Sequence, residues 1–186
     1  MPSPEQLRTR ACLCKQITFR VIGEEVNFAV CHCTNCRRIC GATYTASAWF
    51  LGEVMITWGP QATMCYPGLT ISKDFAWIAG SEASKQYDDR DTSTGEVVHH
   101  WFCTNYGSPM LTQSPRMPGV KIIPIDIFDG QHKWQPNYEQ WRCSRVCFVD
   151  DIRGIKEKSR YEGFPDVEEC ARVWEAYGTL KQGAKA

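Results

Sequence analysis

The sequence predicts a mostly β domain of antiparallel strands, followed by a helical tail at its C-terminal end. Short segments that alternate β-branched and polar residues recur through the chain, and residues 16–22 are an example. Turn signals such as Gly59-Pro60, Pro67-Gly68 and Asn105-Tyr106-Gly107-Ser108-Pro109 separate these segments at the short spacing typical of antiparallel strands. Residues 166–180 differ, because their apolar positions recur at the 3.6-residue spacing of a helix.

The predicted elements follow a polar leader at residues 1–10. A short helical turn over residues 34–40 ends at Gly41, and the polar, charged residues 86–96 are predicted to form an exposed hairpin loop. Asp166 begins the predicted C-terminal helix, because an acidic side chain suits a helix N-terminus. Strands are predicted over residues 16–22, 27–33, 42–50, 54–58, 71–78, 97–102 and 121–128.

The composition is that of an ordinary globular protein. Hydrophobic residues make up 43% and aromatic residues 12% of the 186 residues, which fits a folded chain rather than a disordered one. Lys and Arg number 21, as do Asp and Glu, so the chain has no net charge. We therefore expect no nucleic-acid partner and no anionic membrane partner. The sequence also contains no segment near the ~20 apolar residues that span a bilayer.

The eleven cysteines point to metal binding rather than to disulfides. Their number is odd, and the first 15 residues carry charges without the apolar segment of a secretory signal. We therefore expect a cytoplasmic protein whose thiols stay reduced. Clustered thiols in such a protein are more often metal ligands than disulfide partners.

The densest cluster is the segment Cys31-His32-Cys33-Thr34-Asn35-Cys36. In an extended segment Cys31 and Cys33 face one side and His32 the other, and a turn can return Cys36 toward the two thiols. Three protein ligands on a tetrahedral zinc leave one position for water or substrate. The sequence therefore predicts a reactive zinc site with Cys31, Cys33 and Cys36 as ligands and catalytic residues. The alternative is a set of buried apolar thiols, and His32 is expected to be packed or hydrogen-bonded.

Three thiolate ligands favour sulfur chemistry over hydrolysis. They leave a bound Zn²⁺ with a net charge of about −1, which makes the ion a weak Lewis acid but a good partner for another sulfur ligand. A thiol in the open position would be deprotonated and could add to an aldehyde or another electrophilic carbon. We therefore expect carbon–sulfur lyase-type chemistry on a small-molecule thiol or thiol adduct. Arg37 and Arg38 are candidates to bind the carboxylates of a peptide-like thiol, or they form a solvated surface pair.

Three segments of the chain carry a resemblance, and they read Cys12-x-Cys14, Cys31-His32-Cys33-x-x-Cys36-Arg37-x-x-x-Gly41-Ala42 and Phe102-Cys103-x-x-Tyr106-Gly107-Ser108. Together they resemble the glutathione-dependent formaldehyde-activating enzymes and their centromere-protein-V-like relatives, with a tail of fungal type. The resemblance implies a β-tent fold of stacked antiparallel sheets, with a zinc-binding domain at residues 1–130 and an extension at residues 131–186 packed on it. It also implies the reaction of glutathione with formaldehyde to S-hydroxymethylglutathione.

The resemblance further implies two zinc ions, of which the first belongs to the triple-cysteine segment. Tyr106 departs from the family pattern, because a phenol with a pKa near 10 is a poor zinc ligand beside thiolates. His99 lies about 13 Å before Cys103 along a regular strand, which is too far to replace the missing ligand. One zinc is expected. For the second site three alternatives stay open: water completes the zinc coordination, the site holds no zinc, or Tyr106 packs as an aromatic and the site has been lost. The ligand positions of this second, structural zinc would be Cys12, Cys14, Cys103 and Tyr106.

Two other functions remain open from the sequence. Aromatic residues such as Trp49, Phe50 and Trp101 would allow a pocket larger than formaldehyde requires. A family member repurposed for a larger metabolite of a specialised biosynthetic pathway would need such a pocket. A non-catalytic, zinc-stabilised module that binds a protein partner is the other alternative. The sequence identifies no general base and leaves a homodimer open.

Overall fold

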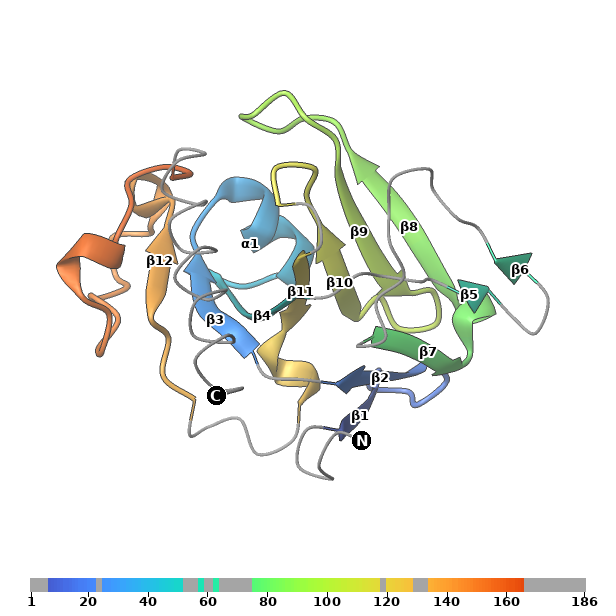
Figure 1. Cartoon of the computed structure of the whole chain (residues 1–186). Coiled ribbons are helices and arrows are strands. Elements are labelled where there is room, and N and C mark those ends of the chain that lie inside the picture. The colour runs from blue at the N-terminus through green and yellow to red at the C-terminus, as the bar shows by residue number, and fades with distance from the viewer. Residues whose placement is uncertain are drawn as a thin grey trace.

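The structure is a computed structural model that describes residues 7–22, 25–51, 57–58, 62–63, 75–117, 120–128 and 134–165. Its elements are β1 (Leu7–Ala11), β2 (Thr18–Ile22), β3 (Glu25–Cys31), α1 (Thr34–Cys40), β4 (Thr45–Leu51), β5 (Thr57–Trp58), β6 (Ala62–Thr63), β7 (Phe75–Ala79), β8 (Ser84–Asp89), β9 (Val98–Cys103), β10 (Pro109–Gln113), β11 (Val120–Pro124) and β12 (Tyr138–Gln140). A seven-stranded sheet has the order β12-β3-β4-β11-β10-β9-β8, and a three-stranded sheet has the order β1-β2-β7 (Figure 1). Strands β5 and β6 pair with each other. The predicted mostly β fold is confirmed.

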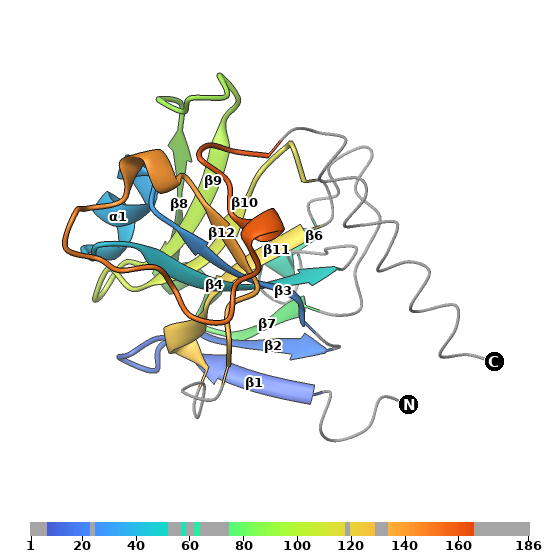
Figure 2. The same ribbon diagram turned by 90° about the vertical axis from the view of Figure 1, so that its left-hand side faces the viewer.

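The three-stranded sheet lies below one face of the seven-stranded sheet, and the main hydrophobic core lies between the two (Figure 2). Side chains alternate across β4 as the strand period requires: Ala48 and Phe50 join this core, whereas Trp49 joins a second cluster. Stacked sheets were predicted, and the two-layer arrangement confirms them. The main core contains Cys12, Ile17, Phe19, Val21, Ala48, Phe50, Trp101, Cys103, Met110, Leu111, Ile123 and Phe128.

Residues from the C-terminal part of the described chain complete the second hydrophobic cluster. Tyr138 of β12 packs on Trp49 with ring centroids 5.3 Å apart, and Tyr161 packs on Tyr138 at 5.1 Å. Strand β12 pairs with β3 in parallel, with Gln140 opposite Cys31. This parallel pair is the exception to the predicted antiparallel pairing. It places residues from the C-terminal part of the chain beside the triple-cysteine segment.

Three predictions along the chain are corrected. Residues 7–10 belong to strand β1 rather than to a polar leader, and residues 86–89 belong to β8 rather than to a loop. Each of these strands lies at the edge of its sheet, where polar and charged side chains are tolerated. Strand β10 begins at Pro109, which the sequence had placed in a turn. The predicted helix at 166–180 lies outside the described residues, as do residues 54–56 and 71–74 of two predicted strands, whose remaining residues belong to β5 and β7.

Within the described part of the chain, no helix is long and apolar enough to span a membrane.

Candidate functional site

The thiols of Cys31, Cys33 and Cys36, here called the first triad, converge where β3 passes into α1. Their sulfur atoms all lie within 4.8 Å of one another. Cys31 ends β3 and is buried, whereas Cys33 is the N-cap of α1, where its Sγ accepts a hydrogen bond from the backbone N–H of Cys36 at 3.3 Å. The helix ends at Gly41, as the sequence predicted, and this glycine is left-handed with a φ of 63°. The cap and the helical turn therefore bring Cys36 back to the first two thiols.

The donor set of the first triad fits a zinc ion. Thiolates bound tetrahedrally at the usual zinc–sulfur distance lie about 3.8 Å apart, a separation that a cluster of this size reaches with small rotamer changes. Within the residues that the structure describes, no fourth His, Cys, Asp or Glu joins this cluster. The triad would therefore supply three sulfur ligands and leave one position open.

The three thiols of the first triad differ in their affinity for protons. The hydrogen bond from Cys31 lowers the pKa of Cys33 to about 3, and the same contact raises the pKa of Cys31 to about 12. Hydrogen bonds to Cys31 and Cys33 also raise the pKa of Cys36. At neutral pH the triad thus carries one thiolate, at Cys33, and two protons.

His32, which lies between two thiols of the first triad, is anchored by β12. Its imidazole is fully buried, as is Glu139, and its Nε2 lies 2.9 Å from Glu139 Oε1. Its backbone N–H also donates to the carbonyl of Gln140 at 3.1 Å. Arg160 donates to the other oxygen of Glu139 at 3.2 Å, and Arg145 lies 3.9 Å from Oε1. The prediction that His32 is hydrogen-bonded is confirmed, and its partner fixes the backbone of the triad segment.

A cavity of about 480 Å³ opens in front of the first triad and is called the triad cavity. His100 and Asp89 lie on its wall, with His100 Nε2 3.9 Å from Asp89 Oδ2. His100 Nδ1 is 2.9 Å from the hydroxyl of Thr112, and Asn35 donates to Asp89 at 2.6 Å. Burial lowers the pKa of His100, so its imidazole is neutral at pH 7. Three thiols and a buried imidazole thus line the same cavity.

The second triad consists of Cys12, Cys14 and Cys103. The Sγ of Cys14 lies 3.3 Å from that of Cys12 and 3.5 Å from that of Cys103. All three sulfur atoms lie within 4.8 Å of one another, so these donors also fit a zinc ion. Cys12 and Cys103 are buried, and Cys14 is partly exposed. A hydrogen bond from the side chain of Asn105 is the main cause that lowers the pKa of Cys14 to about 7.

Tyr106 stands where the resemblance implies a fourth cysteine, and its side chain is 65% exposed. The tyrosine therefore does not pack in a core. His99 does not replace it: its Nδ1 lies 2.8 Å from Asp88 Oδ1, and it is not part of the second triad.

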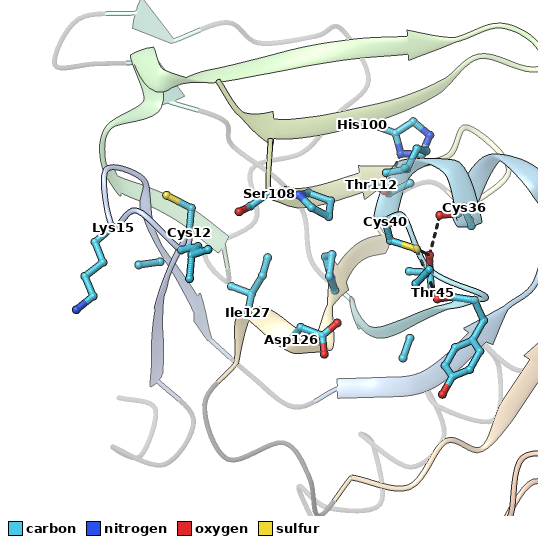
Figure 3. Close-up of a pocket in the computed structure, with 18 of the residues that line it drawn as sticks. Cys12, Lys15, Cys36, Cys40, Thr45, His100, Ser108, Thr112, Asp126 and Ile127 are labelled. Atoms are coloured by element: carbon cyan, nitrogen blue, oxygen red, sulfur yellow. Dashed lines mark hydrogen bonds between the residues drawn. The ribbon is translucent and has the colours of Figure 1, made fainter. Parts of the chain in front are cut away.

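A cavity of about 610 Å³ reaches from the second triad to the first and is called the bridging cavity. Figure 3 shows Cys12 and Lys15 at one end, with Cys36, Cys40 and Thr45 at the other. Cys40 is held by Thr45, whose hydroxyl lies 3.1 Å from its sulfur. One thiol of each triad thus borders the same space.

The other residues considered from the sequence are the two arginines of α1, proposed to bind substrate, and two cysteines near the C-terminal end of the described chain. Arg38 is exposed and borders the triad cavity. Arg37 is partly buried, and its Nε has no hydrogen-bond partner among the described residues. Cys143 and Cys147 are exposed and belong to neither triad.

His100, Asp89 and Glu139 are the site residues that the sequence reasoning did not identify. His100 and Asp89 lie on neighbouring strands, but their contact depends on the pairing of β8 with β9. Glu139 reaches His32 only because β12 joins the far edge of the sheet. The one local signal is the period of β9, in which His100 alternates with the core residues Trp101 and Cys103.

Comparison with known proteins agrees with the motifs. The profile of the family described as glutathione-dependent formaldehyde-activating enzyme matches residues 7–70 and 61–144. Among solved structures, a Rhodobacter sphaeroides protein from a structural-genomics programme is similar with a TM-score of 0.45 and 20% identity, over 66% of this chain and 89% of that chain. Curated proteins give no significant match.

Proposed function

Because the chain belongs to the family of glutathione-dependent formaldehyde-activating enzymes, we propose that it makes or breaks the carbon–sulfur bond between a small thiol and an aldehyde carbon at a zinc bound by the first triad. In the forward direction the thiol loses its proton, sulfur bonds to the carbonyl carbon, and the carbonyl oxygen takes up a proton. The observation that carries the proposal is the convergence of three thiols on a cavity that also contains a buried imidazole.

The three cysteines would hold the zinc ion and leave its fourth coordination position open to the substrate. Cys33 at the helix N-cap and Cys31 at the end of β3 are fixed by backbone structure, so the ligand positions are organised before metal binds. When bound, the zinc lowers the pKa of an incoming thiol and so supplies a thiolate at neutral pH.

His100 is the proposed proton carrier. It is 7% exposed, and its Nδ1 is held by the hydroxyl of Thr112, which orients the ring. In the tautomer in which Nδ1 donates to the Thr112 hydroxyl, Nε2 is free to accept a proton and lies 3.9 Å from Asp89 Oδ2. The neutral imidazole can accept the thiol proton at Nε2, and the imidazolium that results can donate this proton to the oxygen of the adduct; the reverse direction returns it by the same route. Asp89, held by Asn35, supplies a negative charge beside Nε2 that would stabilise the imidazolium.

The shape of the triad cavity favours a substrate larger than a one-carbon aldehyde with a simple thiol. Its volume of about 480 Å³ lies in the range of pockets that bind whole metabolites. Arg38 and Arg116 border it and would attract the carboxylates of a peptide-like thiol, whereas Met117, Trp141 and Phe164 supply apolar wall. A tripeptide thiol such as glutathione fits this mixture, as does a bulkier electrophile joined to a smaller thiol.

Exchange NMR with ¹³C-formaldehyde and glutathione tests the proposal, because it measures formation and breakdown of the adduct at equilibrium. We expect the zinc-loaded protein to accelerate exchange and Cys33→Ser to abolish the acceleration while circular dichroism shows the native fold. Cys143→Ser makes the same chemical change at an exposed cysteine outside the triads and should leave the rate unchanged.

The same experiment separates the alternatives. Acceleration with bulky aldehydes and none with formaldehyde would assign the repurposed function. A protein that accelerates neither reaction, and that unfolds when Cys33 is replaced, would be a zinc-stabilised module rather than an enzyme.

A further inference from the structure

The second triad differs from a closed structural zinc site in one ligand. Its turn is complete: Gly107 adopts the left-handed φ of 79° and donates its N–H to the carbonyl of Cys103 at 2.7 Å, and Cys103 donates to the carbonyl of Ser108 at 2.9 Å. Such a turn carries the fourth ligand at the residue before the glycine, which here is Tyr106. With 65% of its surface exposed, that side chain is in solvent. The turn has therefore kept its geometry and lost its ligand.

The remaining three thiols are still arranged for metal. The sulfur–sulfur distances of 3.3 Å and 3.5 Å at Cys14 are close to the separation of about 3.8 Å between thiolates on a tetrahedral zinc. The backbone N–H of Ile17 donates to Cys12 Sγ at 3.3 Å, which is the type of contact that supports a thiolate ligand. Within the part of the chain that the structure describes, no further His, Cys, Asp or Glu joins the group.

The fourth position of this group is reachable from outside. Cys14 is partly exposed, and Leu13, between the first two thiols, is 67% exposed. The bridging cavity also ends at Cys12, where Lys15 and Ser108 line it (Figure 3). A small molecule can thus approach the three thiols from the protein surface and from the cavity.

We propose that Cys12, Cys14 and Cys103 form a second zinc site that is open, so that its zinc exchanges readily and takes a small thiol as fourth ligand. The thiol would bind through sulfur as a thiolate, and its proton would pass to the solvent. Three thiolates already favour a fourth sulfur ligand over water, because zinc is borderline-soft. This proposal does not depend on catalysis at the first triad.

Metal content and metal release test the proposal without an activity assay. Elemental analysis should find one zinc fewer per chain in Cys14→Ser than in the wild type. Transfer of zinc to a chromophoric chelator should show a fast phase in the wild type that Cys14→Ser lacks. Tyr106→Cys restores the four-cysteine turn and should slow this phase by about tenfold or more, because a closed site must break a protein ligand first. Tyr106→Phe, the matched control, should release zinc at the wild-type rate.

The thiol ligand is tested by cobalt in place of zinc. In a Cys33→Ser background, which removes the contribution of the first triad, 2-mercaptoethanol should increase the sulfur-to-cobalt charge-transfer absorption. The further change Tyr106→Cys should abolish that response. Equal zinc content in Cys14→Ser and the wild type would overturn the proposal. So would equal release rates in Tyr106→Cys and the wild type.

Discussion

The buried pair of His32 and Glu139 makes the most demanding prediction, since it ties the first triad to the C-terminal part of the chain. Glu139→Gln keeps the size of the side chain and removes its charge. The change leaves Arg160, whose side chain is 9% exposed, without its buried counter-charge, and removes the anion that accepts from His32. Breaking a buried ion pair by removing one partner costs about 3–5 kcal/mol. Glutamine retains one acceptor oxygen, so we expect about 3 kcal/mol.

Urea unfolding followed by tryptophan fluorescence measures this loss, with circular dichroism as a second probe of two-state behaviour. Because His32 lies between two thiols of the first triad, we also expect zinc affinity to fall by about 10–100-fold, the usual effect of losing a group that supports metal ligands. The control is Glu157→Gln: Glu157 also pairs with Arg160, at 3.6 Å, but its side chain is 84% exposed. Solvent screens that pair, and the control should behave as the wild type. A loss below about 1 kcal/mol in Glu139→Gln, with unchanged zinc affinity, would refute the anchoring role.

Three further predictions concern protons and charge. The pKa of Cys33 is about 3, that of Cys31 is about 12 and that of Cys36 is also raised, so zinc binding to the first triad at pH 7 should release two protons. Zinc affinity should therefore rise with pH, and calorimetry in buffers of different ionisation enthalpy counts the released protons. Burial lowers the pKa of Lys121 to about 7, so the unfolded chain binds more protons between pH 7 and about 10. Stability should therefore rise with pH across this window by up to about 1.4 kcal/mol per unit, and Lys121→Met should flatten that slope in urea titrations at pH 7.5 and 9. His100→Gln should slow adduct exchange while zinc content stays unchanged, and loss of zinc in this variant would contradict a role in proton transfer.

Local patterns carried the prediction of the first triad. Cys31, Cys33 and Cys36 stand within six residues, so strand alternation, a helical turn and Gly41 were enough to bring their thiols together. The second triad joins Cys14 to Cys103, 89 residues apart, and only the family resemblance related them before the structure did.

The residues around the thiols depend on pairing between strands, which sequence spacing does not encode. Strand β8 was predicted as a loop, because its exposed edge position permits the polar sequence of an irregular segment. Without β8, the carboxylate of Asp89 had no place next to His100. The three-residue strand β12 was not predicted either, because its sequence shows no alternation of apolar and polar residues. Its burial comes from the neighbouring strand and from the segment that covers it.

The parallel attachment of β12 has a consequence for biosynthesis. His32 meets Glu139 across a separation of 107 residues, so the carboxylate leaves the ribosome long after the thiols on either side of the imidazole. During translation the early segment can collect metal while its histidine is still unpartnered. Closing so long a loop is slow compared with forming the hairpin of β3 and β4. The metal-binding loop should therefore reach its final rigidity as one of the last events of folding, after most of the sheet has formed.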